Sequence, residues 1–221
     1  MLCCQKSKHV VQLVESFSFD SNLYLVTKYA SGGDLLQYCL AQDNSKQWMD
    51  EKRAKHIFAQ LAQGLFDMHQ VGLVHRDLKL LNIFLCDSTA YPRVQIGDLG
   101  LACKLRENQF IVKKAGTFAF MAPEVMLNQP ANFKSDIWSL GIILFILIAS
   151  RSPFDGHFFT KNRQAELLAL EISFDHPVWQ TVSPQCVSLL RGMLEKNQSN
   201  RFDIKQVLHH PWLAMSQPLQ F

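Results

Sequence analysis

The chain has 221 residues, of which 48% are hydrophobic and 19% are charged, with a formal net charge of +3 at pH 7. This length suits one domain, and the apolar fraction is sufficient for a buried core, which excludes a disordered chain. Basic residues are dispersed, so nucleic-acid binding has little support. Six cysteines occur without a C-x-x-C pair, which argues against a zinc or dithiol centre and favours a reduced, cytoplasmic location.

The first part of the chain has the pattern of a hairpin followed by helices. Residues 10–19 and 22–29 are rich in β-forming side chains and flank a turn signal at residues 20–22. Asp34 is expected to cap a helix that starts at Leu35. A second helix is predicted from residues 50–51 onward, since its apolar residues recur at helical spacing: Ala54, Ile57, Phe58, Leu61, Ala62 and Leu65.

The second part is expected to be mainly helical. Short strands are predicted at residues 83–85 and 93–97, and residues 101–121 have no clear period and are predicted to be a loop. Helices are predicted from Asp136 onward, interrupted at Pro153, Pro177 and Pro184. The uncharged stretch 137–150 is shorter than the roughly 18 residues needed to span a bilayer, so we expect a buried helix and no membrane association.

Two short motifs carry the chemistry. Residues 75–82 read HRDLKLLN and residues 98–100 read DLG. They supply a candidate base (Asp77), a cation (Lys79), an amide (Asn82) and a carboxylate (Asp98), which is the set of groups that phosphoryl transfer requires. The alternative, a polar loop without chemistry, is disfavoured because so many fixed identities at fixed spacing rarely arise by chance.

Three further segments extend the pattern: APE at residues 122–124, DIWSLG at 136–141, and Arg201. With them the chain resembles the eukaryotic protein kinases from about residue 8 to residue 213. The resemblance implies an α+β, two-lobed kinase fold with a truncated N-terminal β lobe and a complete, mainly α-helical C-lobe. It also implies that Glu124 pairs with Arg201 and that Asp136 braces the backbone of residues 75–82, the catalytic loop.

The same resemblance divides the chain into three parts. Residues 1–29 would be a remnant of the N-lobe, comprising the end of its helix, two strands and the start of the hinge. Residues 30–213 would form the C-lobe, and residues 214–221 a short tail.

By resemblance, the catalytic residues are Asp77, Lys79, Asn82 and Thr117. Asp77 would orient the substrate hydroxyl and accept its proton, Lys79 would stabilise charge on the transferring phosphate, and Thr117 would contact both. Asn82 and Asp98 would bind Mg²⁺, a hard cation that prefers oxygen ligands, and ATP would be the phosphate donor.

The nucleotide-binding residues implied by the resemblance are Thr27, Lys28, Ala30, Asp34, Phe84 and Asp98. Thr27 would be the gatekeeper, the backbone of Lys28 and Ala30 would hydrogen-bond adenine, and Phe84 would lie beneath the purine. The alternative, ordinary strand and core residues, stays open because an apolar strand is a weak signal.

We expect the chain to prefer at most one basic residue in its substrate. Asp34 occupies the position where many basophilic relatives carry an acid for an upstream arginine. Leu81, however, stands where the catalytic loop often carries a second acid.

Two departures from the family pattern stand out. No G-x-G-x-x-G occurs, and the phosphate-pairing lysine with its glutamate partner would lie before residue 1. An incomplete gene product and a genuine truncated form both explain this, and the intact catalytic residues favour the first. In addition, residues 99–116 contain no Ser, Thr or Tyr, so Arg76 would have no phosphate to bind, and we expect no requirement for phosphorylation there.

The favoured function is a protein serine/threonine kinase catalytic domain, which transfers the γ-phosphate of ATP to a hydroxyl of a protein substrate. Lys79 is typical of the Ser/Thr class, and residues 176–179 and 208–212 resemble calcium/calmodulin-dependent kinases. Residues 78–85 are also similar to polo-like kinases, so the subgroup and the oligomeric state stay open. The alternative is a catalytically impaired, truncated kinase-like scaffold or interaction module.

Overall fold

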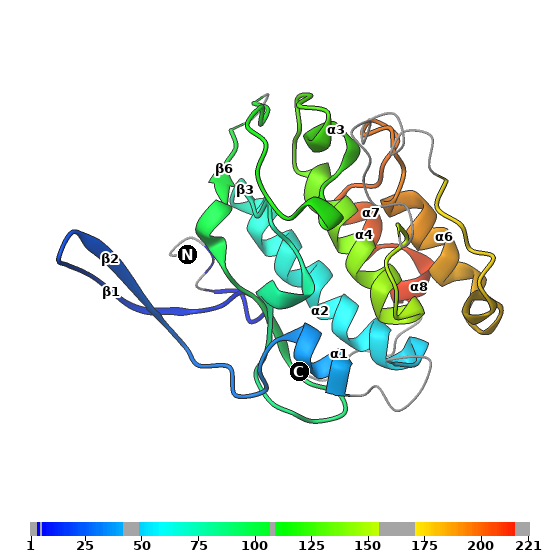
Figure 1. The fold of residues 1–221 in the computed structure, drawn as a ribbon, viewed down its shortest axis with the longest axis horizontal. Helices are drawn as coiled ribbons and strands as arrows, with labels where there is room; N and C mark the ends of the chain where they lie inside the picture. Colours follow the sequence, from blue (N-terminus) through cyan, green and yellow to red (C-terminus); the bar gives the residue numbers. More distant parts are fainter. Residues whose placement is uncertain (1–3, 5, 42–48, 107–108, 155–170, 215–221) are drawn as a thin grey trace.

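The computed structural model describes residues 4, 6–41, 49–106, 109–154 and 171–214. Within these residues a helical body carries a hairpin that extends away from it (Figure 1). The strands described form separate two-stranded ribbons, which pair β1 with β2, β3 with β6 and β4 with β5. This α+β arrangement agrees with the predicted fold class.

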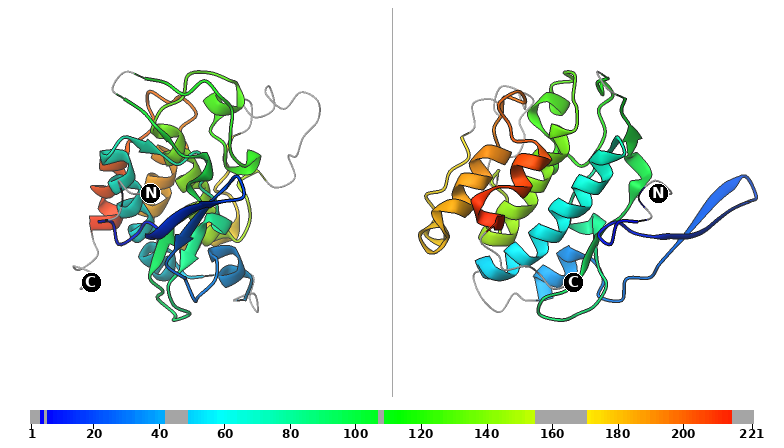
Figure 2. Two further views of the ribbon diagram at one scale, coloured as in Figure 1. Left: turned by 90° about the vertical axis from the view of Figure 1, so that its left-hand side faces the viewer. Right: turned by 180° about the vertical axis from the view of Figure 1, so that it is seen from behind.

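The hairpin consists of β1, Leu13–Phe19, and β2, Asn22–Thr27, paired antiparallel. Asp20 and Ser21 have φ values of 46° and 61°, and positive φ at both central residues is typical of the two-residue turns that match the twist of the flanking strands. The predicted hairpin and its turn are therefore confirmed. The right-hand view of Figure 2 shows that the hairpin stands clear of the helical body.

The first helix begins at its predicted cap, and the second begins at the predicted position. In α1, Leu35–Ala41, the amide of Gln37 donates to Asp34 Oδ1 at 2.9 Å. In α2, Glu51–Gln70, the amide of Arg53 donates to Asp50 Oδ1 at 2.7 Å. The predicted apolar face of α2 is buried in full.

The core lies between α2 and α4, Lys134–Ala149, which pack against each other. The side chains of α4 are buried around its whole circumference, which confirms the expected core helix. Around this pair lie the shorter helices α3 (Pro123–Met126), α6 (Pro184–Met193), α7 (Ile204–Leu208) and α8 (Pro211–Ala214). Among the described residues, no helix combines the length and apolar character that crossing a membrane requires.

Short ribbons and turns surround the two motifs. β3 (Leu73–Val74) pairs with β6 (Cys103–Lys104), and β4 (Ile83–Leu85) pairs with β5 (Val94–Ile96). Single 3-10 turns follow at η2 (Leu80–Asn82), η3 (Leu99–Leu101), η4 (Phe118–Phe120) and η5 (Pro177–Thr181).

Two predictions about these segments were incomplete. Residues 101–121 include β6 and the η4 turn and are not loop throughout, because elements of two or three residues are too short to show a period. Pro177 and Pro184 start η5 and α6 and do not interrupt a helix, since proline suits the first helical position, where its missing N–H costs nothing.

Candidate active site

The carboxylate of Asp77 lies at the centre of a compact group of hydrogen bonds. Its Oδ1 accepts from the amide and from the hydroxyl of Thr117, each at 2.7 Å. Its Oδ2 accepts from Lys79 Nζ at 2.8 Å, and the same Nζ lies 2.9 Å from Thr117 Oγ1. The structure thus brings together three predicted catalytic residues that are up to 40 positions apart in the sequence.

The surroundings of Asp77 keep it ionised. Burial acts to raise the pKa of this carboxyl, but hydrogen bonds from Lys79 and Thr117, with the positive charge of Lys79, outweigh it and lower the pKa below its ordinary value. A carboxylate that remains charged near neutral pH can accept a proton from a hydroxyl placed beside it.

Asn82, the fourth predicted catalytic residue, is oriented by the backbone carbonyl and the carboxylate of Asp77. Its Nδ2 donates to the backbone oxygen of Asp77 at 2.8 Å and lies 3.3 Å from Asp77 Oδ2. Because the amide nitrogen is committed in this way, the Oδ1 of Asn82 is the atom left for a cation.

The β4–β5 ribbon brings Asp98 to the same place. The amide of Gly97 donates to the Asn82 carbonyl at 2.8 Å, so Asp98 directly follows the residue opposite Asn82. Asp98 is exposed and left-handed, with φ of 51°, and its Oδ1 accepts from the Gly100 amide at 3.3 Å. Its Oδ2 accepts no hydrogen bond from the part of the chain that the structure describes. Carboxylate and amide oxygens are ligands that Mg²⁺ prefers, so the two side chains fit this ion.

The catalytic loop is fixed from below by the buried carboxylate of Asp136. Its Oδ2 accepts from the amide of His75 at 2.8 Å and from His69 Nε2 at 3.0 Å, and its Oδ1 accepts from the amide of Arg76 at 2.9 Å. Burial acts to raise the pKa of Asp136, but the hydrogen bond and charge of His69 lead the effects that lower it below the ordinary value. The predicted bracing by Asp136 is confirmed.

The predicted pair of Glu124 and Arg201 is also confirmed. Two parallel hydrogen bonds of 2.7 and 2.9 Å join the carboxylate to the guanidinium, and both side chains are buried. The guanidinium also lies over the ring of Trp138, 5.1 Å from its centroid. This pair fixes α3, and with it the segment that leads from Thr117, against the body.

The predicted adenine site gathers backbone groups at the foot of the hairpin. The Lys28 amide donates to the Gln12 carbonyl at 3.0 Å, and no backbone amide of the described residues donates to the Lys28 carbonyl. The Ala30 carbonyl accepts from Gly33 at 3.4 Å, and the Ala30 amide has no acceptor among the described residues. Thr27, the predicted gatekeeper, is half-buried and pairs with Leu13.

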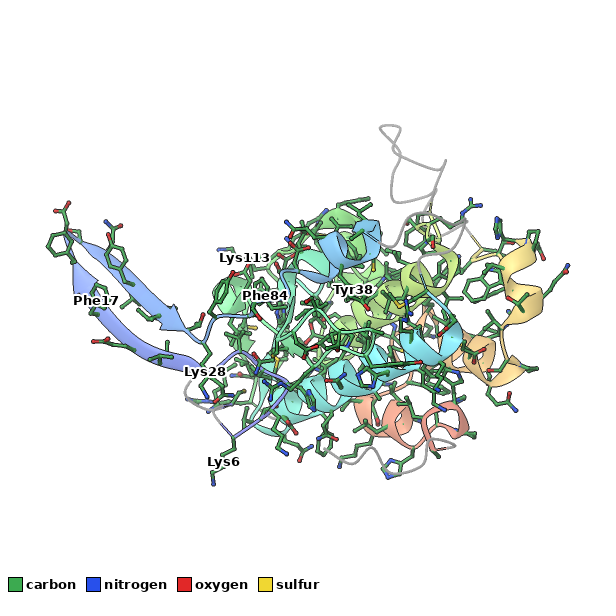
Figure 3. All side chains as sticks on the ribbon, turned by 90° about the horizontal axis from the view of Figure 1, so that it is seen from below. Lys6, Phe17, Lys28, Tyr38, Phe84 and Lys113 are labelled. Atoms are coloured by element: carbon green, nitrogen blue, oxygen red, sulfur yellow. The ribbon has the colours of Figure 1, made fainter. Side chains whose placement is uncertain are left out.

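Phe84 and Asp34 lie on the body beside this foot. The two residues form an isolated antiparallel bridge, and a Cβ placed on Gly97 would come within 2.2 Å of the Phe84 ring. Figure 3 shows Phe84 at the edge of the body and Lys28 where the hairpin joins it. Asp34 is half-buried, and its carboxylate is committed to the first turn of α1.

Two residues of the site were missed from the sequence. His69 holds Asp136, but it lies at the end of α2 outside any motif, so no sequence signal marked it. Gly116, with φ of 110°, packs so closely that a Cβ would come within 2.3 Å of the Arg76 carbonyl. Its position directly before Thr117 was the available signal.

Comparison with known proteins agrees with this geometry. The protein kinase domain model matches residues 1–213. The chain is 32% identical over 205 residues to the serine/threonine-protein kinase ATG1a of Arabidopsis thaliana, covering 93% of this chain and 32% of that protein. It is 31% identical over 217 residues to the calcium/calmodulin-dependent protein kinase type II alpha chain of Drosophila melanogaster, covering 96% of this chain and 39% of that protein.

A third relative gives the same result. The calcium/calmodulin-dependent protein kinase type II of Caenorhabditis elegans is 32% identical over 216 residues, which is 96% of this chain and 29% of that protein. The chain therefore spans about a third of the length of these curated relatives. On the family match and these identities, the chain belongs to the protein kinase family.

Proposed function

We propose that this chain carries the catalytic residues of a protein serine/threonine kinase, which transfers the γ-phosphate of ATP to a hydroxyl of a protein substrate. The observation that supports this most directly is the hydrogen-bonded triangle of Asp77, Lys79 and Thr117 beside Asn82 and Asp98. The serine/threonine-protein kinase among the relatives, together with the lysine at position 79, favours the Ser/Thr class.

In this proposal each side chain has one task. Asp77 positions the acceptor hydroxyl and takes its proton, and its lowered pKa keeps it ionised for that purpose. Lys79 stabilises negative charge at the transferring phosphate. Thr117 bonds to both Asp77 and Lys79 and keeps their side chains in position. Asn82 and Asp98 would hold Mg²⁺, which neutralises phosphate charge when bound with ATP.

The nucleotide is proposed to bind at the foot of the hairpin. The Lys28 carbonyl and the Ala30 amide offer one acceptor and one donor on neighbouring backbone, which suits the edge of an adenine ring. Phe84 offers an aromatic surface on the side of the body, and Thr27 leaves space behind as a small gatekeeper. We place this activity in the cytoplasm.

The substrate is proposed to carry at most one basic residue near the acceptor. The carboxylate of Asp34 is committed to capping α1, which limits its attraction for a cation. Leu81 in the catalytic loop is 48% exposed and offers an apolar surface in place of a second carboxylate.

The proposal is tested by measuring Mg²⁺-dependent phosphorylation of a Ser/Thr peptide library with the 221-residue chain and with Asp77→Asn. We expect turnover to fall by roughly 10²- to 10⁴-fold in the variant, because the proton acceptor is lost. Asp20→Asn is the matched control, since it makes the same exchange in the exposed hairpin turn, where asparagine tolerates positive φ.

Three results would contradict the proposal. Equal turnover in the parent chain and in Asp77→Asn would remove Asp77 from its role. Dependence on two adjacent upstream arginines would refute the substrate preference. No turnover in any form would favour the alternative of a catalytically impaired kinase-like scaffold.

A further inference from the structure

The guanidinium of Arg76 binds a backbone carbonyl. Its Nη2 donates to the Lys113 oxygen at 2.9 Å, and it forms no ion pair with a carboxylate of the described residues. The Arg76 backbone is left-handed, with φ of 71°, a conformation that is costly for this residue type. It is held by the hydrogen bond from the Arg76 amide to Asp136 Oδ1. The buried carboxylate of Asp136 therefore fixes the backbone from which the Arg76 side chain extends.

The Lys113 carbonyl belongs to a segment, residues 109–117, that is tied to the body at both ends. Ile111 and Ala131 exchange two backbone hydrogen bonds of 2.8 and 2.9 Å. At the other end, Gly116 packs against the Arg76 carbonyl and Thr117 bonds to Asp77. Arg76 therefore binds this segment midway between its two attachments.

No side chain of this segment before Thr117 can supply a phosphate for Arg76. Residues 99–116 contain no Ser, Thr or Tyr. The Lys113 side chain is exposed and forms no hydrogen bond or ion pair with the described residues. The contact of this residue with Arg76 is therefore made by its backbone carbonyl. A hydrogen bond from a charged donor is among the stronger ones, so this contact can take the place of a phosphate.

We propose that Arg76 is a positioning residue that holds residues 109–117 against the catalytic loop through the Lys113 carbonyl. The triangle of Asp77, Lys79 and Thr117 is thereby assembled without a phosphate on this segment. The part of the proposal that concerns turnover rests on the proposed kinase function. The part that concerns position does not, and it can be measured independently.

The test is hydrogen–deuterium exchange of the backbone amides of residues 109–121 in the parent chain, Arg76→Ala and Lys113→Ala. We expect Arg76→Ala to accelerate exchange in this segment by about tenfold or more, because a charged hydrogen bond is lost. Lys113→Ala keeps the carbonyl and is the matched control, for which we expect unchanged exchange. The midpoint of chemical unfolding, measured in parallel, should be nearly the same in all three proteins.

A second variant covers the case in which Arg76→Ala does not fold. Arg76→Lys retains one donor without the planar fork, and we expect it to raise exchange several-fold. Unchanged exchange in both arginine variants, or equal acceleration in Lys113→Ala, would overturn the proposal. So would exchange that rises only in step with global unfolding.

A turnover measurement separates this proposal from the proposed function. If the chain phosphorylates peptides, phosphatase treatment should leave its rate unchanged, and a large loss of rate after that treatment would overturn the proposal. If the chain shows no turnover, the kinase assignment fails, and the exchange measurements still decide whether Arg76 positions the segment.

Discussion

At the scale of single residues, burial decides what a charge does in this molecule. Lys79 is partly exposed and bonds to Asp77 and Thr117, whereas Arg201 is fully buried and every nitrogen of its guanidinium is bonded. Besides Glu124, it donates to the backbone oxygens of Glu195, Lys134 and Lys196. Such a residue is costly to disrupt, because removing one partner leaves a buried charge uncompensated.

The same reasoning applies to the buried carboxylate of Asp136, and it predicts the effect of replacing this residue by asparagine. The amide nitrogen of asparagine cannot accept, so one of the donors from His69, His75 and Arg76 loses its partner. We expect Asp136→Asn to reduce the free energy of unfolding at pH 7 by roughly 3 kcal/mol. Chemical unfolding of the variant beside the parent measures this, and a loss below 1 kcal/mol would contradict it.

The pH dependence of the same variant is a further check. The folded pKa of Asp136 is lowered, so its contribution to stability is complete above the unfolded value of 3.8 and is lost as the pH falls through that value toward the folded pKa. As the pH is lowered from 5 to below 3.8, the free energy of unfolding should therefore fall more in the parent chain than in Asp136→Asn. A steeper loss in the variant would show that the carboxylate is not stabilised as described.

At the scale of elements, the close packing of a side chain on a glycine determines how α6 meets the segment that precedes α7. In α6, a Cβ added to Gly192 would come within 2.1 Å of the Phe202 ring. The amide of Phe202 also donates to the Gly192 carbonyl at 3.0 Å, so the two cannot separate without breaking that bond. The glycine is required here by contact and not by an unusual backbone angle.

We therefore predict that Gly192→Ala destabilises the chain by about 1–3 kcal/mol, the usual cost of overpacking, although alanine is the better helix former. Thermal or chemical unfolding measures the change. Phe202→Leu in the same chain should restore part of the loss by removing the ring. Ser188→Ala, on the exposed face of α6, is the control and should be nearly neutral. Equal stability of Gly192→Ala and the parent would contradict this packing.

The elements also show what could be predicted from sequence. The α2 helix was predicted because its apolar residues repeat at helical spacing, and α4 was predicted because its long uncharged run is too short to span a membrane and is expected to be buried. The triangle of Asp77, Lys79 and Thr117 was expected from the resemblance to protein kinases. The strand β6 and the partner His69 were not, because a two-residue strand has no period and a bond between residues 69 and 136 depends on tertiary packing.

At the scale of the whole molecule, the hairpin contrasts with the body. Its apolar side chains point to both faces and are exposed: Val14, Phe17, Phe19, Leu23, Tyr24, Leu25 and Val26. Phe17 and Tyr24 stack on each other at 5.1 Å, which covers only part of one face. A two-stranded ribbon with free edges is marginally stable, and its unpaired backbone groups can pair with another strand.

Self-association of the 221-residue chain should therefore depend on the hairpin. Leu23 and Leu25 lie on one face, opposite Ser18 and Ser16, so the double variant Leu23→Thr with Leu25→Thr would make that face polar while keeping β propensity. We expect it to lower the concentration-dependent increase in mass seen by light scattering after size-exclusion chromatography. Leu40→Thr on α1 is the matched control, since Leu25 and Leu40 are both 52% exposed. If the double variant associates as strongly as the parent, or if Leu40→Thr has the same effect, the hairpin is not the surface responsible.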